Sequence, residues 1–103
     1  MTYKTKTLPA AKEDIRKTAR WYNKARPGLG IEFTARVRQR ANDLIDNPLV
    51  CQIRYKEVHT AVVRQFPYMI HYTVNQKTKT IEVIAVLSTH RDPRLWDKRS
   101  SKK

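Results

Sequence analysis

The chain has 103 residues, with 22 Lys and Arg against 9 Asp and Glu, which gives a formal net charge of +13. This length suits one domain around a single core, so no second domain is expected. The charge predicts a polyanionic partner, either a nucleic acid or an acidic protein, although a basic surface that only keeps the chain soluble is also consistent with it.

Cysteine usage and hydropathy indicate the compartment. Cys51 is the single cysteine, so no internal disulfide can form and a reducing environment is expected. The start of the chain has no apolar signal segment, and no apolar run approaches the length of a membrane span. The sequence therefore predicts a cytoplasmic protein with no membrane partner.

The first half of the chain predicts a short strand and two helices. Residues 3–8 alternate weakly and predict a strand at or near a sheet edge. From Pro9 to about Lys24, apolar residues recur on one face, as in an amphipathic helix. The 27–30 segment contains Pro and two Gly and breaks that helix. A second helix is predicted from Leu29 until Asn47 and Pro48 end it.

The second half predicts a sheet. A weak pattern between residues 49 and 59 indicates a short strand, and segments 61–66 and 69–74 are rich in β-branched and aromatic residues. Residues 81–87 are apolar on both faces, which predicts the central strand. The fold class is therefore α+β in the order β-α-α-β-β-β, with a helical hairpin on one face of a largely antiparallel sheet. We expect the other face to be open to a partner, the domain to span residues 1–97, and residues 98–103 to form a basic flexible tail.

The sequence predicts neither a cofactor nor a metal site. Gly28 and Gly30 are the only glycines, and they lie between two helices, whereas a phosphate-binding loop follows a strand. His59, His71 and Cys51 have no spacing typical of metal ligands.

Several short motifs, spread over nearly the whole chain, together resemble the RelE/ParE toxin superfamily. They are Asp14-Ile15, Trp21-Tyr22, Pro27-Gly28-Leu29-Gly30 with Phe33, Asn47-Pro48, Phe66-Pro67-Tyr68 with Ile70 and Tyr72, and Arg91-Asp92-Pro93 with Trp96. The resemblance implies a type II toxin, of the plasmid-stabilization kind, that arrests growth and is neutralised by a cognate antitoxin. It also implies two alternative activities. One branch cuts messenger RNA on the ribosome, and the other poisons DNA gyrase without nuclease chemistry.

The residues favour the gyrase branch. The nuclease branch carries basic residues at positions that match Thr60, Val62 and Met69 here, and none of these three side chains can be positively charged. A metal-independent endoribonuclease needs several cationic groups around one phosphate. We therefore expect a ParE-like gyrase inhibitor that is not an enzyme. A ribosome-dependent mRNA interferase is the alternative, and a non-toxic relative that only binds an antitoxin or nucleic acid is the second alternative.

Individual side chains have both functional and structural interpretations. His90 could shuttle a proton or only make local hydrogen bonds, and Arg91 could bind phosphate or pair with Asp92. Trp21 could pack inward or mark a partner surface. If the chain is a nuclease, the catalytic candidates are Arg64, His90 and Arg91; the target-binding candidates are Tyr68, Arg91, Arg94 and Trp96; the antitoxin-binding candidates are Arg16, Arg20, Trp21, Arg36 and Arg40.

Overall fold

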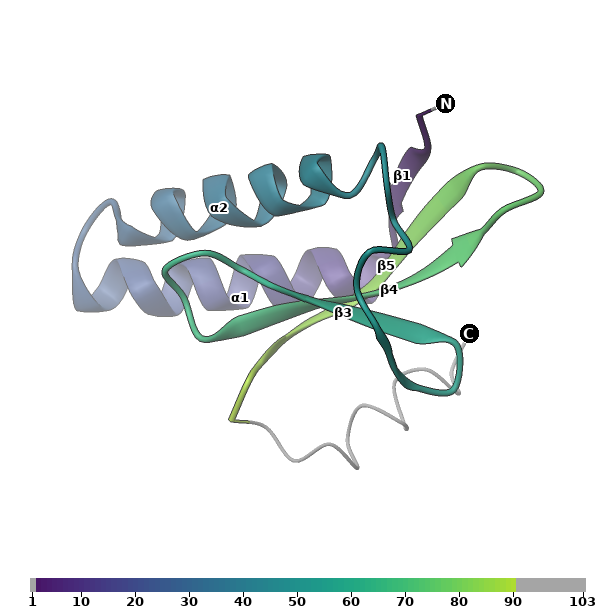
Figure 1. Cartoon of the computed structure of the whole chain (residues 1–103). Coiled ribbons are helices and arrows are strands. Elements are labelled where there is room, and N and C mark those ends of the chain that lie inside the picture. The colour runs from purple at the N-terminus through teal and green to yellow at the C-terminus, as the bar shows by residue number, and fades with distance from the viewer. Residues whose placement is uncertain (1, 91–103) are drawn as a thin grey trace.

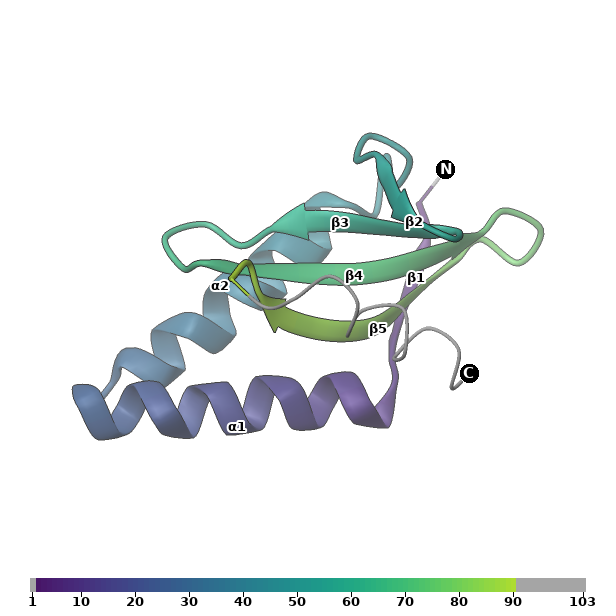
Figure 2. The same cartoon turned by 90° about the horizontal axis from the view of Figure 1, so that it is seen from below.

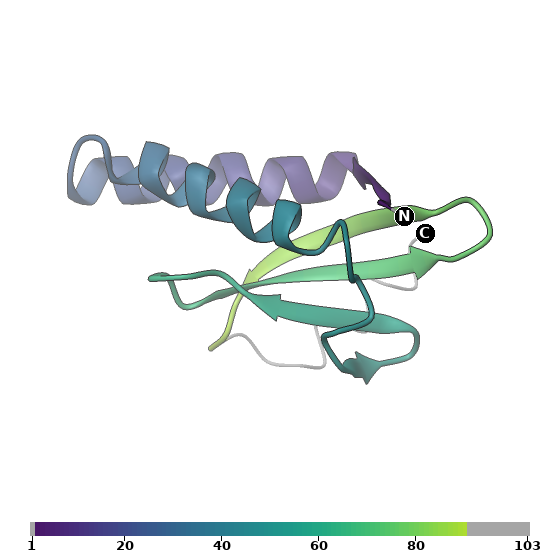
Figure 3. The same ribbon diagram turned by 45° about the horizontal axis from the view of Figure 1, so that its top comes forward.

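Two antiparallel helices lie on one face of a twisted five-stranded sheet (Figure 1). The computed structural model describes residues 2–90 of the chain. The same layers are visible from a second angle in Figure 3, where the sheet lies below both helices. In chain order the elements are β1 (Lys4–Thr7), α1 (Pro9–Ala25), α2 (Leu29–Asp43), β2 (Ile53–Tyr55), β3 (Val58–Val62), β4 (Tyr68–Asn75) and β5 (Thr80–Ser88).

The strand order in the sheet is β1-β5-β4-β3-β2. β1 pairs with β5 in parallel, and every other neighbouring pair is antiparallel. The predicted α+β class with a largely antiparallel sheet is thus confirmed. The prediction that residues 81–87 form the central strand is wrong. β4 is the third of the five strands and so is central, and β5 lies between β4 and the edge strand β1. β5 is nevertheless apolar on both sides because Val83 packs in the main core under the helices, whereas Ile84 and Leu87 belong to a cluster on the opposite face.

The helical hairpin is tight because of its glycines. Gly28 has φ 94°, in the left-handed region that glycine adopts without strain, and it forms the N-cap of α2. A Cβ at Gly30 would lie 2.1 Å from the carbonyl oxygen of Ala19, so only glycine permits this approach of α2 to α1. The Asn23 side chain accepts a 2.7 Å hydrogen bond from the Gly30 N–H. α2 ends at Asp43, four residues before the predicted end, but Leu44 beyond it remains buried in the core.

An aromatic cluster fastens the hairpin to the sheet. The Phe33 ring lies 5.2 Å from both Phe66 and Tyr68, in edge-on contact, and the Tyr22 ring lies 5.0 Å from Phe66. Edge-to-face pairs at this spacing are favourable beyond their buried area. The Phe66-Pro67-Tyr68 corner therefore serves the packing of α1 and α2 on the sheet.

Two long-range hydrogen bonds involve other residues of the sequence motifs. The Val86 N–H donates to the Asp14 carboxylate at 3.0 Å, which ties α1 to β5 beside a β-bulge in the β4–β5 pairing. The buried Tyr72 hydroxyl donates to the Pro48 carbonyl at 2.7 Å and so holds the loop after α2 against β4. Asp14, Pro48 and Tyr72 thus have structural roles that their motif positions alone did not reveal.

The second face of the sheet carries its own apolar cluster, formed by Val58, Met69, Ile84, Ala85 and Leu87, all buried. The prediction that this face is open therefore fails over the middle of the sheet. Val62, near the end of β3, is the exception, with 58% of its surface exposed. The predicted tail of residues 98–103 lies outside the described residues. Within residues 2–90, no helix is long and apolar enough to cross a membrane.

Candidate functional site: one end of the sheet and two basic hollows

Arg64 and His90 lie at the same end of the sheet. The Val63 N–H, just after β3, donates a backbone hydrogen bond to the Tyr68 carbonyl, and Tyr68 pairs with Ser88, so these three residues form a row across the sheet. Arg64 and His90 each follow this row in their own segment. Neighbouring strands are about 4.8 Å apart, so Val63 and Ser88 in this row are roughly 10 Å apart. Figure 2 shows the loop after β3 and the end of β5 at this end of the sheet.

His90 lies in an exposed turn immediately after β5. Its backbone N–H donates to the Ser88 hydroxyl at 3.1 Å, and the preceding Thr89 N–H donates to the Pro67 carbonyl at 2.8 Å. These bonds fix the backbone of the turn while the residue itself remains exposed. The predicted candidates Arg91, Arg94 and Trp96 lie outside the described residues. Of the three catalytic candidates, the described residues include Arg64 and His90, and both lie at this end of the sheet.

An uncharged patch occupies the positions that match the cations of the nuclease branch. Thr60 pairs with His71, and Val62 pairs with Met69, so the four side chains are neighbours on the sheet face opposite the helices. Thr60, Met69 and His71 are buried. His71 Nδ1 lies 3.1 Å from the Tyr55 hydroxyl. We call Thr60, Val62 and Met69 the neutral patch. None of these three side chains is ionisable, so they cannot provide charge to a phosphate.

Arg64 instead lies beside arginines of α2. It lines a hollow of about 230 Å³ with Arg36 and Arg40, which had been predicted to contact an antitoxin. Val62, Gln39 and Asp43 complete the lining. Sequence spacing does not indicate that Arg64 lies beside these two arginines, because this arrangement depends on how α2 packs beside the end of β3. We call this feature the arginine hollow.

A second, more apolar hollow lies between α1 and α2. The two helices are joined at one end and diverge toward the other (Figure 2). Its volume is about 410 Å³. Its floor is apolar and its rim carries the cations Lys12, Arg16 and Arg38; the apolar lining is Ile15, Val37, Ala41, Ile70 and Val83. Arg16 is one of the residues predicted to contact an antitoxin, whereas Lys12 and Arg38 are not in that predicted set, although both flank the apolar stripes of their helices. We call this hollow the helix groove.

The other two antitoxin candidates lie outside both hollows. Arg20 is on the exposed side of α1, 3.8 Å from the Glu13 carboxylate. Trp21 is 63% exposed and contacts the Tyr22 ring edge-on at 5.0 Å. The side chain of Trp21 therefore points outward and is accessible to a partner. Tyr68, a target-binding candidate, is half-buried against Phe33 and Tyr22.

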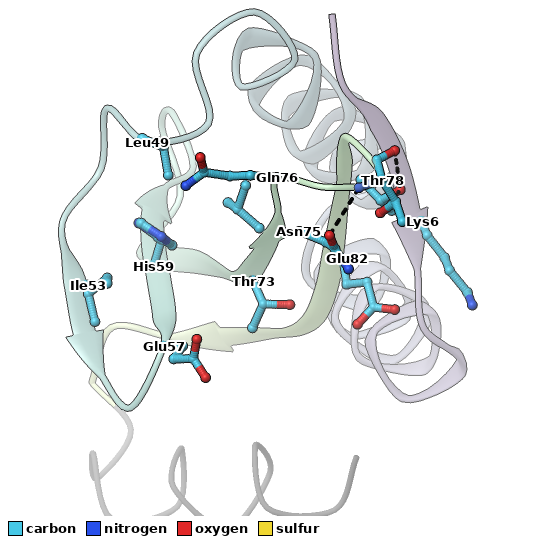
Figure 4. Close-up of a pocket in the computed structure, with 12 residues that line it drawn as sticks. Lys6, Leu49, Ile53, Glu57, His59, Thr73, Asn75, Gln76, Thr78 and Glu82 are labelled. Carbon is cyan, nitrogen blue, oxygen red and sulfur yellow. Dashed lines mark hydrogen bonds between the residues drawn. The ribbon is translucent and has the colours of Figure 1, made fainter.

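A hollow of about 580 Å³, larger than the two described above, lies at the opposite end of the sheet, beside the β4–β5 turn (Figure 4). Glu57, Glu82, Lys6 and His59 are its ionisable lining groups. His59 Nδ1 lies 2.7 Å from the Cys51 carbonyl oxygen; a carbonyl only accepts, so Nδ1 carries the proton. Residues 2–90 contain no group of three or more His, Cys, Asp or Glu that could hold a metal ion. This hollow therefore offers neither a nucleophile with its base nor a metal centre.

Tyr72 is the side chain whose ionisation the fold perturbs most clearly. Burial raises its pKa above the ordinary value of 10.0, and the neighbouring Cys51 raises the pKa further. Burial also raises the pKa of Tyr22, with Tyr68 as a second cause. Both hydroxyls are therefore neutral at physiological pH. They act as packing and hydrogen-bonding groups, and neither is poised as a general base.

Comparison with solved structures supports this fold. A chain of the chromosomal ParDE toxin–antitoxin system from P. aeruginosa matches with a TM-score of 0.73 at 14% identity, covering 84% of this chain and 96% of that chain. A free E. coli RelE toxin with two arginines replaced by alanine matches with a TM-score of 0.75 at 15% identity, over 99% and 98% of the two chains. A chain of the RelBE2 toxin–antitoxin complex from Mycobacterium tuberculosis matches with a TM-score of 0.60 at 21% identity, covering 85% of this chain and 99% of that chain. These identities establish a shared fold only.

The sequence itself identifies the family. No curated protein sequence matches the chain. The family model of the ParE toxin of type II toxin–antitoxin systems, parDE, matches residues 6–93, which is most of the chain. That match includes both helices and all the strands after β1, and it confirms the predicted membership of the RelE/ParE superfamily. The chain belongs to the ParE toxin family of type II toxin–antitoxin systems.

Proposed function

We propose that this protein is a toxin that poisons DNA gyrase and is held inactive by a cognate antitoxin. The observation that carries the choice of target is the neutral patch of Thr60, Val62 and Met69. Two of its three side chains are buried and none is ionisable. Membership of the ParE family is consistent with this choice.

The argument against RNA cleavage is electrostatic. Without a metal, cleavage requires a base for the 2′-hydroxyl, charge stabilisation of a pentavalent phosphorane and an acid for the leaving oxygen. Removing one group that stabilises transition-state charge typically costs about 3–4 kcal/mol, or 10²- to 10³-fold in rate. At three positions in the neutral patch no such group exists, and Arg64 lies toward α2 beside Arg36 and Arg40. Little phosphodiester cleavage is expected from what remains.

The helix groove is the proposed antitoxin site. Its apolar floor, formed in part by Ile15, Val37 and Ile70, suits the apolar face of a helix, and its rim cations suit acidic residues on that helix. The formal charge of +13 makes an acidic partner favourable over the whole surface. Complementary charge accelerates association and is screened by salt, so the affinity of the complex should fall as salt rises.

The target is tested with purified components. The proposal predicts that the purified toxin, added to gyrase, ATP and supercoiled plasmid, accumulates linear DNA covalently bound to gyrase, which detergent and protease release. The toxin pre-mixed with its antitoxin should give none. Normal gyrase turnover at a large excess of active toxin contradicts the proposal, provided that the same preparation arrests growth when expressed in cells.

The alternative target, the ribosome with its mRNA, has one observation in its favour, which is that Arg64 and His90 lie at the same end of the sheet. It predicts that His90→Ala or Arg64→Gln removes toxicity without unfolding the protein. A chain that binds the antitoxin but causes no growth arrest on expression would instead be the non-toxic relative.

A further inference from the structure

We propose that the arginine hollow, formed by Arg36, Arg40 and Arg64, binds a phosphate group of a nucleic-acid backbone. This goes beyond the proposed function, because the toxin itself would contact nucleic acid, whether its target is gyrase or the ribosome. The hollow is separate from the helix groove: the two share no lining residue.

Two of the three guanidinium groups are held in place by neutral acceptors. Arg36 donates from Nε to the Gln65 amide oxygen at 2.9 Å and from NH1 to the Gln39 amide oxygen at 3.1 Å. Arg40 donates from Nε to the Val62 carbonyl at 3.0 Å. Amide and carbonyl oxygens orient a guanidinium group without cancelling its charge, so the positive potential of the hollow is retained.

Little negative charge compensates these cations. Among residues 2–90, Asp43 is the only carboxylate in the lining; it lies 3.9 Å from Arg40, and its side chain is 58% exposed. The Arg40 side chain is only 28% exposed, but a pair at that distance with an exposed carboxylate is weak and is screened by salt. Arg64 makes no hydrogen bond or ion pair within residues 2–90 and has an exposed side chain. The guanidinium N–H groups of Arg64 are therefore available to donate hydrogen bonds to an anion.

The backbone at Gln65 supports a binding role. Gln65 has φ 72°, in the left-handed region that a residue with a side chain rarely adopts. Such strain persists where the surroundings impose it, and it is common at ligand sites. Here the strained residue supplies the amide that positions Arg36.

The chemistry of the hollow favours phosphate over an acidic protein segment. Arginine forks bind phosphate oxygens through two parallel hydrogen bonds. In the described part of the chain, residues 2–90, Val62 is the only apolar residue in the lining, whereas a protein helix needs an apolar floor such as that of the helix groove. A phosphodiester needs only donors and positive charge, and phosphate contacts of this kind position a protein on nucleic acid without reading its sequence.

The test compares two variants that lose the same charge at different places. Arg64→Gln removes a cation from the hollow, and Arg20→Gln removes one from the exposed side of α1. Binding of the full chain to a fluorescein-labelled DNA duplex is measured by anisotropy over a range of salt concentrations. Circular dichroism melts establish that both variants fold like the parent.

The expected result follows from counterion release. Each lost phosphate contact reduces the steepness of the plot of log affinity against log salt by about 0.9. If parent and variant bind equally at 1 M salt, the variant should therefore bind the duplex roughly 8-fold more weakly than the parent at 0.1 M salt. Arg64→Gln should show that loss, Arg64→Lys should recover part of it, and Arg20→Gln should change affinity by less than about twofold. Replacing chloride with inorganic phosphate at equal ionic strength should weaken duplex binding by the parent more than by Arg64→Gln.

Equal losses in Arg64→Gln and Arg20→Gln would mean diffuse attraction to the whole surface and would overturn the proposal. A second result would also overturn the proposal: inorganic phosphate binds the hollow, but the two variants bind the duplex equally well. The hollow would then be a site for a free anion. Neither result depends on the gyrase assay, so the failure of one proposal is distinguishable from the failure of the other.

Discussion

Replacing Tyr72 with Phe should destabilise the fold by about 2 kcal/mol. The ring is fully buried, and its hydroxyl donates to the carbonyl of the buried Pro48 at 2.7 Å. The substitution keeps the ring but removes the donor. Removing one partner of a hydrogen bond so that a buried acceptor is left unsatisfied costs roughly 1–3 kcal/mol, and about 2 kcal/mol is the middle of that range. For a domain of this size, 2 kcal/mol corresponds to a fall in melting temperature of roughly 8–16 °C.

The same substitution should remove a pH dependence. Tyr72 has a raised pKa, with burial as the main cause, against 10.0 for an ordinary tyrosine. Above about pH 10 the unfolded chain releases this proton while the folded chain keeps it, so the unfolded state binds fewer protons. The stability contributed by the raised pKa is thus fully present below pH 10 and falls by about 1.4 kcal/mol per pH unit above it. The advantage of the parent over Tyr72→Phe should therefore shrink as pH rises from about 10 to 11.

Urea unfolding followed by circular dichroism measures both effects. Tyr3→Phe is the matched control, because it also removes one hydroxyl, and the contact of Lys79 with the Tyr3 ring, 5.1 Å from its centroid, needs only the ring. The reasoning is refuted if Tyr72→Phe costs no more than Tyr3→Phe. It is also refuted if the difference between parent and variant stays constant across that pH range.

Three further predictions concern the hairpin, the turn and the groove. Gly30→Ala should cost about 2–3 kcal/mol, because its Cβ would lie 2.1 Å from the Ala19 carbonyl oxygen; a melting temperature equal to that of the parent contradicts this packing. His90→Ala should change stability by less than about 0.5 kcal/mol and leave growth arrest intact, because the residue is exposed and the proposed function uses no proton transfer; loss of growth arrest with an unchanged melt points to the nuclease alternative. Arg38→Glu should weaken antitoxin binding by about tenfold in calorimetric titrations at low salt, whereas Lys24→Glu, outside the groove, should have little effect; equal effects argue against the groove.

The sequence predicted the elements well where periodicity is strong and local. The start of α1 at Pro9 and the break at Gly28 follow from backbone preferences, and both lie where they were expected. The β3 strand runs from Val58 to Val62, earlier than the predicted 61–66, because the chain turns near Gln65. That turn depends on a left-handed residue that is not glycine, which no sequence pattern signals.

The site was less predictable because it depends on tertiary packing. The neutral patch was recognised from a resemblance to the nuclease branch, and the structure adds that Val62 and Met69 are paired neighbours on one face. The meeting of Arg64 with Arg36 depends on the packing of α2 beside the end of β3, which sequence spacing does not specify. The prediction that residues 81–87 form the central strand failed for a related reason. Apolar residues on both faces are typical of any interior strand, and both β4 and β5 are interior.

The most direct measurement of the central claim is primer-extension mapping of a defined mRNA on purified ribosomes incubated with the active toxin. The account predicts full-length extension products at toxin concentrations that convert plasmid and gyrase into the covalent cleaved complex, because the neutral patch provides no charge to an RNA phosphate. New 3′ ends within the codon in the ribosomal A site, lost in a variant lacking His90, would contradict it.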